Sequence, residues 1–584
     1  MRVFSKSGIC WLVGCAMIAA TVAAAPPIAA ANSSAPVIVV GKDASSRERL
    51  ASQELQRYLY HLTGDRLEIR TDRDVKHSRF SAMVAVGTAS TNQVLGDLVD
   101  QAQLPSGDEA PGPEGYVVKT VEYRDTPTIA VMGSDANGAL YGSYELLERY
   151  GARFYIGRDV IPEPKKPFAV QQLDIAEEPA HERRGLLPWH NFLNGPSGYS
   201  YEDFTSYIDQ LAKLKMNTLV LHNYADGHGG RPMNEPFLNF EYRGVKHDGW
   251  LDTSVSGRYH HVRWGMEPFE TGELAFGSGD YFPYDVMGSD AARYTDEQPD
   301  AQKYIFSKAQ AMLRKVIHYA QSRGMEVVLG TDFDIAPREI LQAGGDPLDP
   351  EILKARIDNI VDTYPTLRYV QFHFHEHSTT STADAIKALR FAHDYLKQRR
   401  PEARLVTGGW FQEARFPEMD KALPKDIIFS TLMPHNMTVA PEWGQLSPER
   451  DIWPIPWMEH DANLSEPQFG VTRMEQQLPK LRELGAEGVF GILWRERPAE
   501  ANVAYLAQDA WQPAGEVLAA EDFYRDYATA NFGAAVADEA VDAFLAIEAT
   551  GFPKTSGMTV EYGQWRLWGC CTEVQVATWK RIKE

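Results

Sequence analysis

Cysteine is scarce in this sequence. Only four cysteines occur among 584 residues, and two of these, Cys10 and Cys15, lie in an apolar stretch near the N-terminus. The other two, Cys570 and Cys571, are adjacent. A disulfide framework is therefore excluded as the main source of stability, and a chain of this length does not need one.

Basic clusters and long apolar runs are also missing. The 58 Lys and Arg residues are outnumbered by 80 Asp and Glu residues, which gives a formal net charge of -22. Because phosphate binding requires clustered Lys and Arg, we expect no nucleic acid partner. After the N-terminal stretch, no segment approaches the roughly 20 apolar residues that a membrane span needs, so none is expected.

The N-terminal segment has the features of a secretory signal. Arg2 and Lys6 precede an apolar run, and Ala29-Ala30-Ala31 forms a small-residue cleavage site. We therefore expect residues 1–31 to be a signal peptide and the protein to be periplasmic or extracellular. Two alternatives are an uncleaved membrane anchor and a lipoprotein attached at Cys15, which ends Leu12-Val13-Gly14-Cys15.

Residues 35–172 are expected to form a small α/β domain. Short apolar strands at 37–40, 66–69, 82–86, 115–121 and 128–132 accompany helical patterns at 45–62 and 136–150. Gly64 and Gly151 follow these helices, as glycine commonly does at helix ends. The prolines of Pro162-Glu163-Pro164 indicate a linker to the next domain.

Residues 182–512 are expected to form a (β/α)8 barrel of the TIM type. Helical patterns separate most of the candidate buried strands, and this alternation of strand and helix is typical of that fold. Two separate doubly wound units are the alternative. The eight candidate strands are 185–189, 218–222, 326–330, 369–375, 405–410, 427–432, 452–457 and 488–494.

Two further segments complete the predicted organisation. About seventy residues, roughly 223–298, separate the second strand from the next helix, and we interpret them as a wall or lid of the active site. Residues 513–584 are expected to be a C-terminal helical region. The pattern at 573–583 has no clear helix end, which suggests that the sequence is truncated there.

Two motifs resemble a known family. Gly133-Ser-Asp-Ala-Asn-Gly-Ala-Leu-Tyr-Gly-Ser-Tyr-Glu-Leu-Leu-Glu-Arg-Tyr-Gly151 and Glu54-Leu-Gln-Arg-Tyr-Leu resemble the domain that precedes the barrel in the α-glucuronidases of glycoside hydrolase family 67. The β-hexosaminidases of family 20 have a similar domain. The resemblance implies an exo-acting carbohydrase, and it suggests a uronic acid as the substrate sugar.

The barrel departs from family 20 at one position. Enzymes of that family have an adjacent Asp-Glu pair after strand four, whereas this sequence has His373-Phe374-His375-Glu376-His377, which lacks the Asp. This difference weakens the hexosaminidase interpretation, which we keep as an alternative.

Glycoside hydrolysis needs two carboxyl groups, and in a barrel they belong at the carboxyl ends of strands. Glu376, after strand four, is our candidate for the acid. Glu459, after strand seven, or Glu496, after strand eight, is the candidate for its partner. Because Arg495 and Arg497 flank Glu496, we expect this carboxyl to stay ionised. Either arginine is also a candidate to bind a substrate carboxylate. Other carboxylates near strand ends are Asp332, Asp334, Glu413 and Asp461.

Aromatic, imidazole and amide side chains near the same strand ends suit sugar recognition, because sugar rings pack on aromatic faces and their hydroxyls need polar partners. We also expect Trp453 to lie at this end of the barrel, together with the tryptophans named next. The candidate substrate-binding residues are Trp189, His190, Asn191, His222, Asn223, Asp332, His373, His375, Trp410, His435, Asn436, Trp457, Trp494, Arg495 and Arg497.

We expect no cofactor and no metal, although one pattern favours the opposite. His373 and His375 are two residues apart on a strand, so they share a face and could bind zinc. The leading prediction is an exported exo-glycosidase resembling α-glucuronidases, whose partner is an oligosaccharide or polysaccharide substrate. A metal-dependent hydrolase or lyase and a non-catalytic glycan-binding protein are the alternatives.

Overall fold

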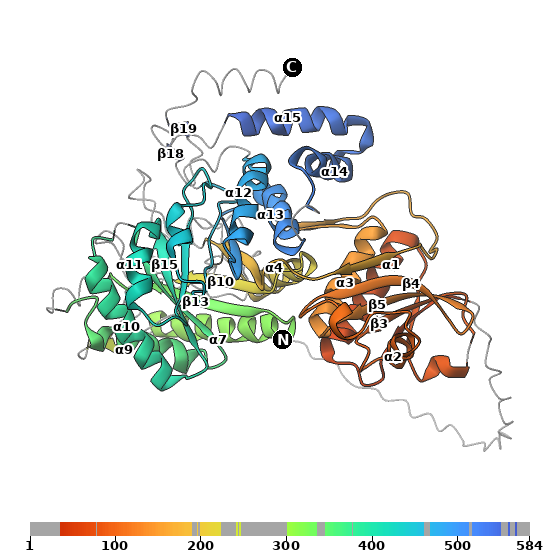
Figure 1. The fold of residues 1–584 in the computed structure, drawn as a ribbon, viewed down its shortest axis with the longest axis horizontal. Helices are drawn as coiled ribbons and strands as arrows, with labels where there is room; N and C mark the ends of the chain where they lie inside the picture. The colour runs from red at the N-terminus through yellow and green to blue at the C-terminus, as the bar shows by residue number, and fades with distance from the viewer. Residues whose placement is uncertain are drawn as a thin grey trace, which may run out of the picture.

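The computed structural model describes residues 35–77, 79–189, 196, 199–223, 241–242, 245–246, 301–335, 345–376, 378–460, 468–512, 517–550, 559–560 and 567–568. Figure 1 shows the N-terminal α/β domain beside a larger barrel domain, with the C-terminal helices above both. The expected signal segment, the long 223–298 connection after Asn223 and the helix at 573–583 lie outside the described residues, apart from two short strands within that connection.

The N-terminal domain is a six-stranded mixed sheet in the order β2-β1-β3-β5-β4-β8. Strands β2, β1, β3 and β5 run parallel, and β4 is antiparallel to both of its neighbours. The strands are β1 (Val37–Val40), β2 (Glu68–Thr71), β3 (Met83–Gly87), β4 (Tyr116–Tyr123), β5 (Thr126–Gly133) and β8 (Asp174–Glu177).

Helices cover both faces of this sheet. Ile38 and Val40 belong to the large core that contains residues of α1 (Ser46–Thr63) and α3 (Ala136–Arg149). Val37 and Val39 point the other way and pack with α2 (Gln93–Asp100), which the sequence analysis did not anticipate. A capping box between Ser45 and Glu48 begins α1.

The domain extends beyond the expected boundary at residue 172. Strand β8 pairs with β4, so the chain returns to the first sheet after the proline turn at 162–164. A small hairpin, β6 (Arg153–Tyr155) and β7 (Arg158–Val160), precedes that turn. The turn is therefore a loop of the N-terminal domain and not a linker between domains.

The second sheet is a parallel barrel in the order β16-β15-β14-β13-β10-β9-β17. The pairing of β17 with β9 joins the last strand to the first. All eight expected strands are found. They comprise β9 (Arg183–Pro188), β10 (Thr218–Asn223), β13 (Glu326–Asp332), β14 (Tyr369–Phe374), β15 (Arg404–Trp410), β16 (Ile428–Leu432), β17 (Gly488–Leu493) and the segment 452–457.

Segment 452–457 closes the barrel through isolated bridges to β16 and β17. The backbone N–H groups of Trp453 and Ile455 donate to β16 over 2.7 and 3.0 Å. Pro454 and Pro456 accept hydrogen bonds from β17 but have no N–H to donate in return. The two prolines therefore reduce the number of backbone hydrogen bonds that this segment makes, but the barrel stays closed.

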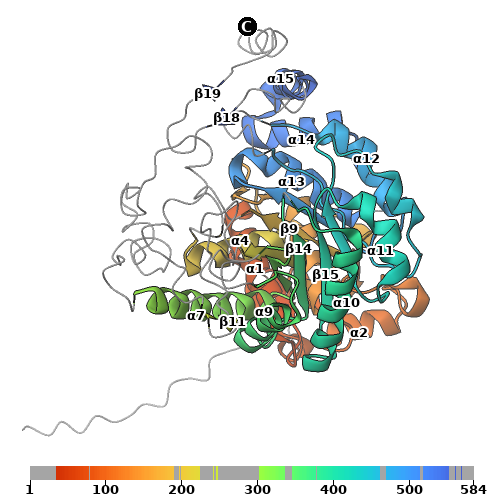
Figure 2. The same cartoon turned by 90° about the vertical axis from the view of Figure 1, so that its left-hand side faces the viewer.

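Helices surround the barrel and continue into the C-terminal region (Figure 2). Gly533, with a φ of 91°, lies between the last two helices. The barrel helices are α4 (Tyr201–Lys213), α7 (Ala301–Ser322), α9 (Pro350–Thr363), α10 (Thr382–Arg399), α11 (Phe416–Ala422), α12 (Val471–Glu483) and α13 (Glu496–Trp511), followed by α14 (Ala520–Phe532) and α15 (Ala537–Ala549). The 3-10 helices are η1 (Asp74–His77), η2 (Gly107–Glu109), η6 (Glu413–Arg415), η7 (Pro441–Gln445) and η9 (Ala534–Val536). Short two-residue strands are β11 (Glu241–Tyr242), β12 (Val245–Lys246), β18 (Thr559–Val560) and β19 (Leu567–Trp568).

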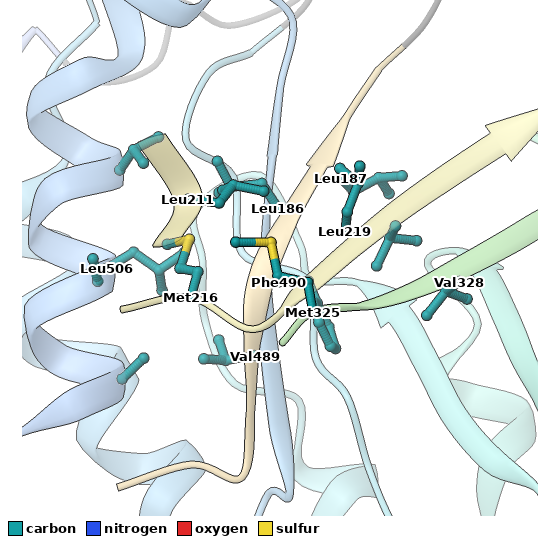
Figure 3. Close-up of a cluster of buried hydrophobic side chains, with 14 of the residues drawn as sticks. Leu186, Leu187, Leu211, Met216, Leu219, Met325, Val328, Val489, Phe490 and Leu506 are labelled. Carbon is teal, nitrogen blue, oxygen red and sulfur yellow. The ribbon is translucent and has the colours of Figure 1, made fainter. Parts of the chain in front are cut away.

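Apolar side chains between the barrel strands and the outer helices hold these two layers together. Figure 3 shows Leu186, Leu219 and Phe490, from β9, β10 and β17, beside Met216 and Leu506. All five are at most 1% exposed. Within the described ranges, no helix is both long enough and apolar enough to cross a bilayer.

The N-terminal domain is fastened to the amino-terminal end of the barrel. The Arg184 side chain, 1% exposed, forms an ion pair with Glu114 and donates to the carbonyls of His181 and Lys215 over 2.7 and 3.0 Å. Trp511, at the end of α13, stacks on Tyr116 with 5.5 Å between ring centroids. Sites of this fold are built at the opposite, carboxyl-terminal end. The β6–β7 hairpin also reaches the barrel there, because Arg158 pairs with Glu500 near the start of α13 at 2.6 Å.

Candidate active site

A continuous aromatic cluster fills the carboxyl-terminal end of the barrel. Trp189 contacts Trp410 at 5.2 Å and Trp494 at 6.3 Å between ring centroids. Trp457 contacts Trp410 at 6.0 Å and stacks on Trp494 at 5.7 Å. The tryptophans that were predicted to share this end of the barrel therefore do come together, although they lie far apart in the chain.

The position of this cluster corrects the expected tryptophan rim. Trp189, Trp457 and Trp494 are 1 to 3% exposed and Trp410 is 8% exposed, so these indoles form the floor of the site more than an open platform. Phe411, which the sequence analysis missed, is 42% exposed and stacks on Trp457 at 6.3 Å. Its φ of 53° accompanies the turn that brings the ring out of β15.

Trp453 does not belong to this end of the barrel. It begins strand seven, and its indole N–H donates to Glu487, just before β17, over 3.0 Å. Its ring packs on Tyr369, the first residue of β14. It lies at the amino-terminal end because parallel strands present their first residues there.

A buried polar cluster of His222, Asp332 and His373 lies beside Trp189. Nε2 of His222 is 3.0 Å from Oδ1 of Asp332, and Nδ1 of His373 is 3.6 Å from the same oxygen. The rings of Trp189 and His222 stack at 5.0 Å. Burial acts to raise the pKa of Asp332, but His222 and His373 outweigh it and hold that pKa well below its usual range.

Several other predicted binding residues are placed differently. Asn223 follows His222 on β10, so the alternation of a strand turns its side chain to the opposite face from His222, and it is 0% exposed. Asn436 is exposed, and its side-chain oxygen Oδ1 accepts the backbone N–H of Thr438 over 3.1 Å, which stabilises a local turn. Three candidates lie outside the described residues: His190, Asn191 and Asp461.

Glu459 is held by a dense set of donors at the end of strand seven. It is 1% exposed, and one oxygen accepts the backbone N–H groups of Trp494 and Arg495 over 3.1 and 2.8 Å. The other oxygen, Oε1, accepts Nε of Arg495 over 2.5 Å and also forms an ion pair with Nη2 of the same guanidinium. Burial raises the pKa of Glu459, whereas Arg495 and the two N–H groups favour its ionised form.

The setting of Glu496 differs from the expectation. Its flanking arginines point elsewhere: Arg495 binds Glu459, and Arg497 is exposed and lies 3.7 Å from Glu500. Glu496 instead accepts a hydrogen bond from the hydroxyl of Tyr199. Burial raises its pKa, whereas flanking arginines were expected to lower it. Successive residues entering a helix point in different directions, and sequence adjacency therefore failed as a guide.

Glu376 lies in the turn directly after β14, and its side chain is exposed. The turn is held by Asp334, which accepts the backbone N–H of His375 over 2.9 Å and the hydroxyl of Ser378. His375 is half-buried and does not join His373 in the buried cluster. Thus the expected His373–His375 pair is not a unit, and Asp334 orients the segment that carries Glu376.

Two histidines near strands six and seven border the cluster. His435 and His460 lie 4.2 Å apart between ring centroids, and each contacts Trp457. Burial lowers the pKa of His460 to about 3, so its imidazole is neutral near pH 7. Gln468 binds both backbone polar groups of His460, at 2.7 and 3.0 Å. No periodic pattern in the sequence pointed to His460 or Gln468.

Glu413, a carboxylate that the sequence analysis noted after strand five, is buried at the start of η6. It is 5% exposed, and Oε1 has no hydrogen-bond partner in the described part of the chain. Burial raises its pKa to about 7, and the charge of Glu442 acts in the same direction. Folding therefore favours its protonated form.

This raised pKa predicts a pH-dependent stability difference. The stabilisation of neutral Glu413 is fully present below the unfolded pKa of about 4.5 and is lost as pH rises towards 7. The free energy of unfolding of Glu413→Gln, relative to that of wild type, should therefore rise by about 2 kcal/mol between pH 4.5 and pH 8. Urea unfolding at both pH values measures this. The exposed Glu418→Gln on α11 is the control, and equal pH dependence in all three proteins would contradict the assignment.

Comparisons with known proteins agree with this architecture. Residues 27–146 match the family model described as the N-terminus of glycosyl hydrolase family 67. A search of curated proteins found no match. The family 67 resemblance of the N-terminal domain is therefore confirmed.

Solved structures similar to most of this chain include several glycoside hydrolases. A family GH20 β-N-acetylhexosaminidase from Streptomyces coelicolor A3(2) is 16% identical with a TM-score of 0.53, over 87% of this chain and 92% of that one. A family GH138 enzyme targeting pectin rhamnogalacturonan II is 14% identical with a TM-score of 0.54, over 88% of this chain and 55% of that one.

A family GH115 4-O-methyl-α-glucuronidase with specificity for decorated arabinogalactans is 11% identical with a TM-score of 0.53. The match covers 88% of this chain and 61% of that one, so this chain spans only part of the GH138 and GH115 proteins. At these identities the likeness establishes the fold. The chain shares the fold of these glycoside hydrolases, with a domain that matches the family 67 N-terminus in front of a TIM-type barrel.

Proposed function

We propose that the protein is an exo-acting glycoside hydrolase resembling α-glucuronidases, which acts on oligosaccharides derived from plant or microbial polysaccharides. One observation carries the proposal. Glu459, held by Arg495 and two backbone N–H groups, ends strand seven at the same end of the barrel where Glu376 follows strand four. This barrel is joined to a family 67 N-terminal domain.

The two carboxyl groups take different roles in this proposal. Glu376, in an exposed turn, donates the proton to the leaving oxygen. Glu459 acts as the ionised partner, because the Arg495 side chain and the backbone N–H groups of Trp494 and Arg495 donate to it and stabilise negative charge. Glu496 is the weaker candidate for this role, since it accepts a hydrogen bond from Tyr199 where Glu459 has an arginine partner.

The sugar would bind above the buried tryptophan floor. Phe411, the most open ring of this group, offers a face for the C–H groups of a sugar. His375 and His435 are half-buried polar groups for its hydroxyls. Arg497 is exposed near the start of α13 and is the cation proposed for a substrate carboxylate, because Arg495 is committed to Glu459.

A panel of aryl glycosides tests the proposed activity. We expect the wild-type protein to release the phenol faster from an α-glucuronide than from β-N-acetylhexosaminides or neutral glycosides. A hexosaminide as best substrate would replace the uronic acid assignment while keeping the hydrolase. Tight sugar binding without turnover of any substrate would instead indicate a glycan-binding protein and would refute the proposal.

We also propose that the protein is exported, on the basis of its N-terminal sequence, so that it meets extracellular or periplasmic carbohydrate. Lipid attachment at Cys15 is the alternative form of export.

A further inference from the structure

The buried polar cluster of His222, Asp332 and His373 has an arrangement that the proposed hydrolysis does not require. The three side chains come from the carboxyl ends of β10, β13 and β14, which are neighbours in the barrel. One ring nitrogen of each histidine and one oxygen of Asp332 all lie within 4.8 Å of one another. We propose that these three residues form a binding site for a divalent transition metal ion of the zinc class.

The distances suit such an ion. Zinc binds imidazole nitrogen and carboxylate oxygen at about 2.0–2.2 Å, which separates neighbouring ligand atoms by about 3.3 Å in a tetrahedral site. Nε2 of His222 lies 3.0 Å from Oδ1 of Asp332, and one ring nitrogen of His373 lies within 4.8 Å of a ligand atom of each of these two residues. Small side-chain rotations would therefore accommodate the ion without a change in the backbone.

The protonation pattern of His373 adds an independent observation. Its Nδ1 lies 3.0 Å from the carbonyl oxygen of Phe374, which fixes the proton on that nitrogen. The lone pair is then on Nε2, which is buried and has no hydrogen-bond partner among the described residues. Metal-binding histidines commonly donate their second nitrogen to a carbonyl in this way, and an ion would satisfy the buried lone pair.

Burial and charge also favour a bound cation. The three residues are at most 4% exposed, so the negative charge of Asp332 lies in a region of low polarity. A bound cation would compensate that charge. A divalent ion with one carboxylate and two neutral imidazoles carries a net charge of about +1, and a fourth position remains for water or a substrate oxygen. Two histidines and one carboxylate favour zinc or a similar ion over magnesium or calcium.

The site differs from the metal site considered from the sequence. That alternative paired His373 with His375, but His375 lies in the turn held by Asp334. Here His222 takes the place of His375, from a strand about 150 residues earlier in the chain. The proposal is independent of the glycosidase proposal, because a metal can bind whether or not the barrel hydrolyses a sugar.

Metal content and binding in the full-length protein test this site. We expect purified wild type, loaded with zinc and dialysed, to retain about one zinc per chain, and the chelator-treated protein to bind Zn²⁺ saturably by calorimetry. His222→Ala, His373→Ala and the nearly isosteric Asp332→Asn should each weaken zinc binding at least about 100-fold, since even loss of an outer partner costs 10–100-fold. His318→Ala, an exposed histidine of α7, is the matched control and should bind as wild type does.

Each outcome decides the proposal. Circular dichroism identifies the variants that remain folded. If an alanine variant unfolds, Asp332→Asn still tests the site, because it keeps the shape of the cluster. Loss of zinc in Asp332→Asn and the folded histidine variants, with retention in His318→Ala, supports the site. No saturable binding by wild type, or equal binding by wild type and Asp332→Asn, would overturn it.

Discussion

Arg495→Met is expected to lower the free energy of unfolding by about 3–5 kcal/mol at pH 7, because it leaves Glu459 as a buried carboxylate without its ion-pair partner. Glu459 is 1% exposed and would keep only the two backbone N–H donors. The loss should be smaller at acidic pH, where burial already favours the protonated form of Glu459. Urea unfolding at pH 5 and pH 7 measures both effects.

Two variants separate this effect from the loss of any surface arginine. Arg497→Met removes the neighbouring arginine, which is exposed and 3.7 Å from Glu500, and should change stability by less than about 0.5 kcal/mol. The double variant Arg495→Met with Glu459→Gln removes the charge as well and should recover part of the loss. Equal destabilisation by Arg495→Met and Arg497→Met would mean that Glu459 is not an uncompensated buried charge in the variant.

Glu376→Gln is expected to reduce kcat by about 10²–10⁴-fold on a substrate whose leaving group needs protonation, because the amide cannot donate the proton in the transition state. The loss should be much smaller on a 4-nitrophenyl glycoside, whose phenolate leaves without assistance. The ratio of the two losses distinguishes an acid from a group that only binds substrate. Initial rates on an oligosaccharide and on the aryl glycoside of the same sugar measure it.

Glu402→Gln provides the control for this comparison. Glu402 is exposed just before β15, at the amino-terminal end of the barrel, and its substitution should leave both rates unchanged. Equal losses on both substrates in Glu376→Gln would indicate a positioning role for Glu376 and would remove it as the acid.

The sequence predicted the barrel well because its strands are short apolar runs at regular intervals. Even segment 452–457 was recognised, although Pro454 and Pro456 leave it with isolated bridges. Helices α2, α11 and α13 were missed, because α2 and α11 are short and α13 begins within the Arg-Glu-Arg-Pro motif at 495–498. The domain boundary was misplaced because the return of β8 to the first sheet depends on long-range pairing.

The site was only partly predictable, since strand ends can be located from sequence but side-chain partners cannot. Glu459 and Arg495 were both named, yet their ion pair crosses from strand seven to strand eight. Likewise, His222, Asp332 and His373 were named separately, and their cluster depends on the alignment of three neighbouring strands. The direction of the pKa shift inferred from neighbours in sequence was wrong at Glu496, because the side chain faces Tyr199 and not the flanking arginines.

The central claim is that the carboxyl-terminal end of the barrel hydrolyses glycosidic bonds with Glu376 as the acid. A proton NMR time course with a glucuronic acid-bearing oligosaccharide tests it most directly, because it detects the released sugar without an artificial leaving group. The account predicts new anomeric signals with wild type, and at least a hundredfold slower release with Glu376→Gln. Equal release by the two proteins, or no release by wild type from any uronic or neutral oligosaccharide, would contradict it.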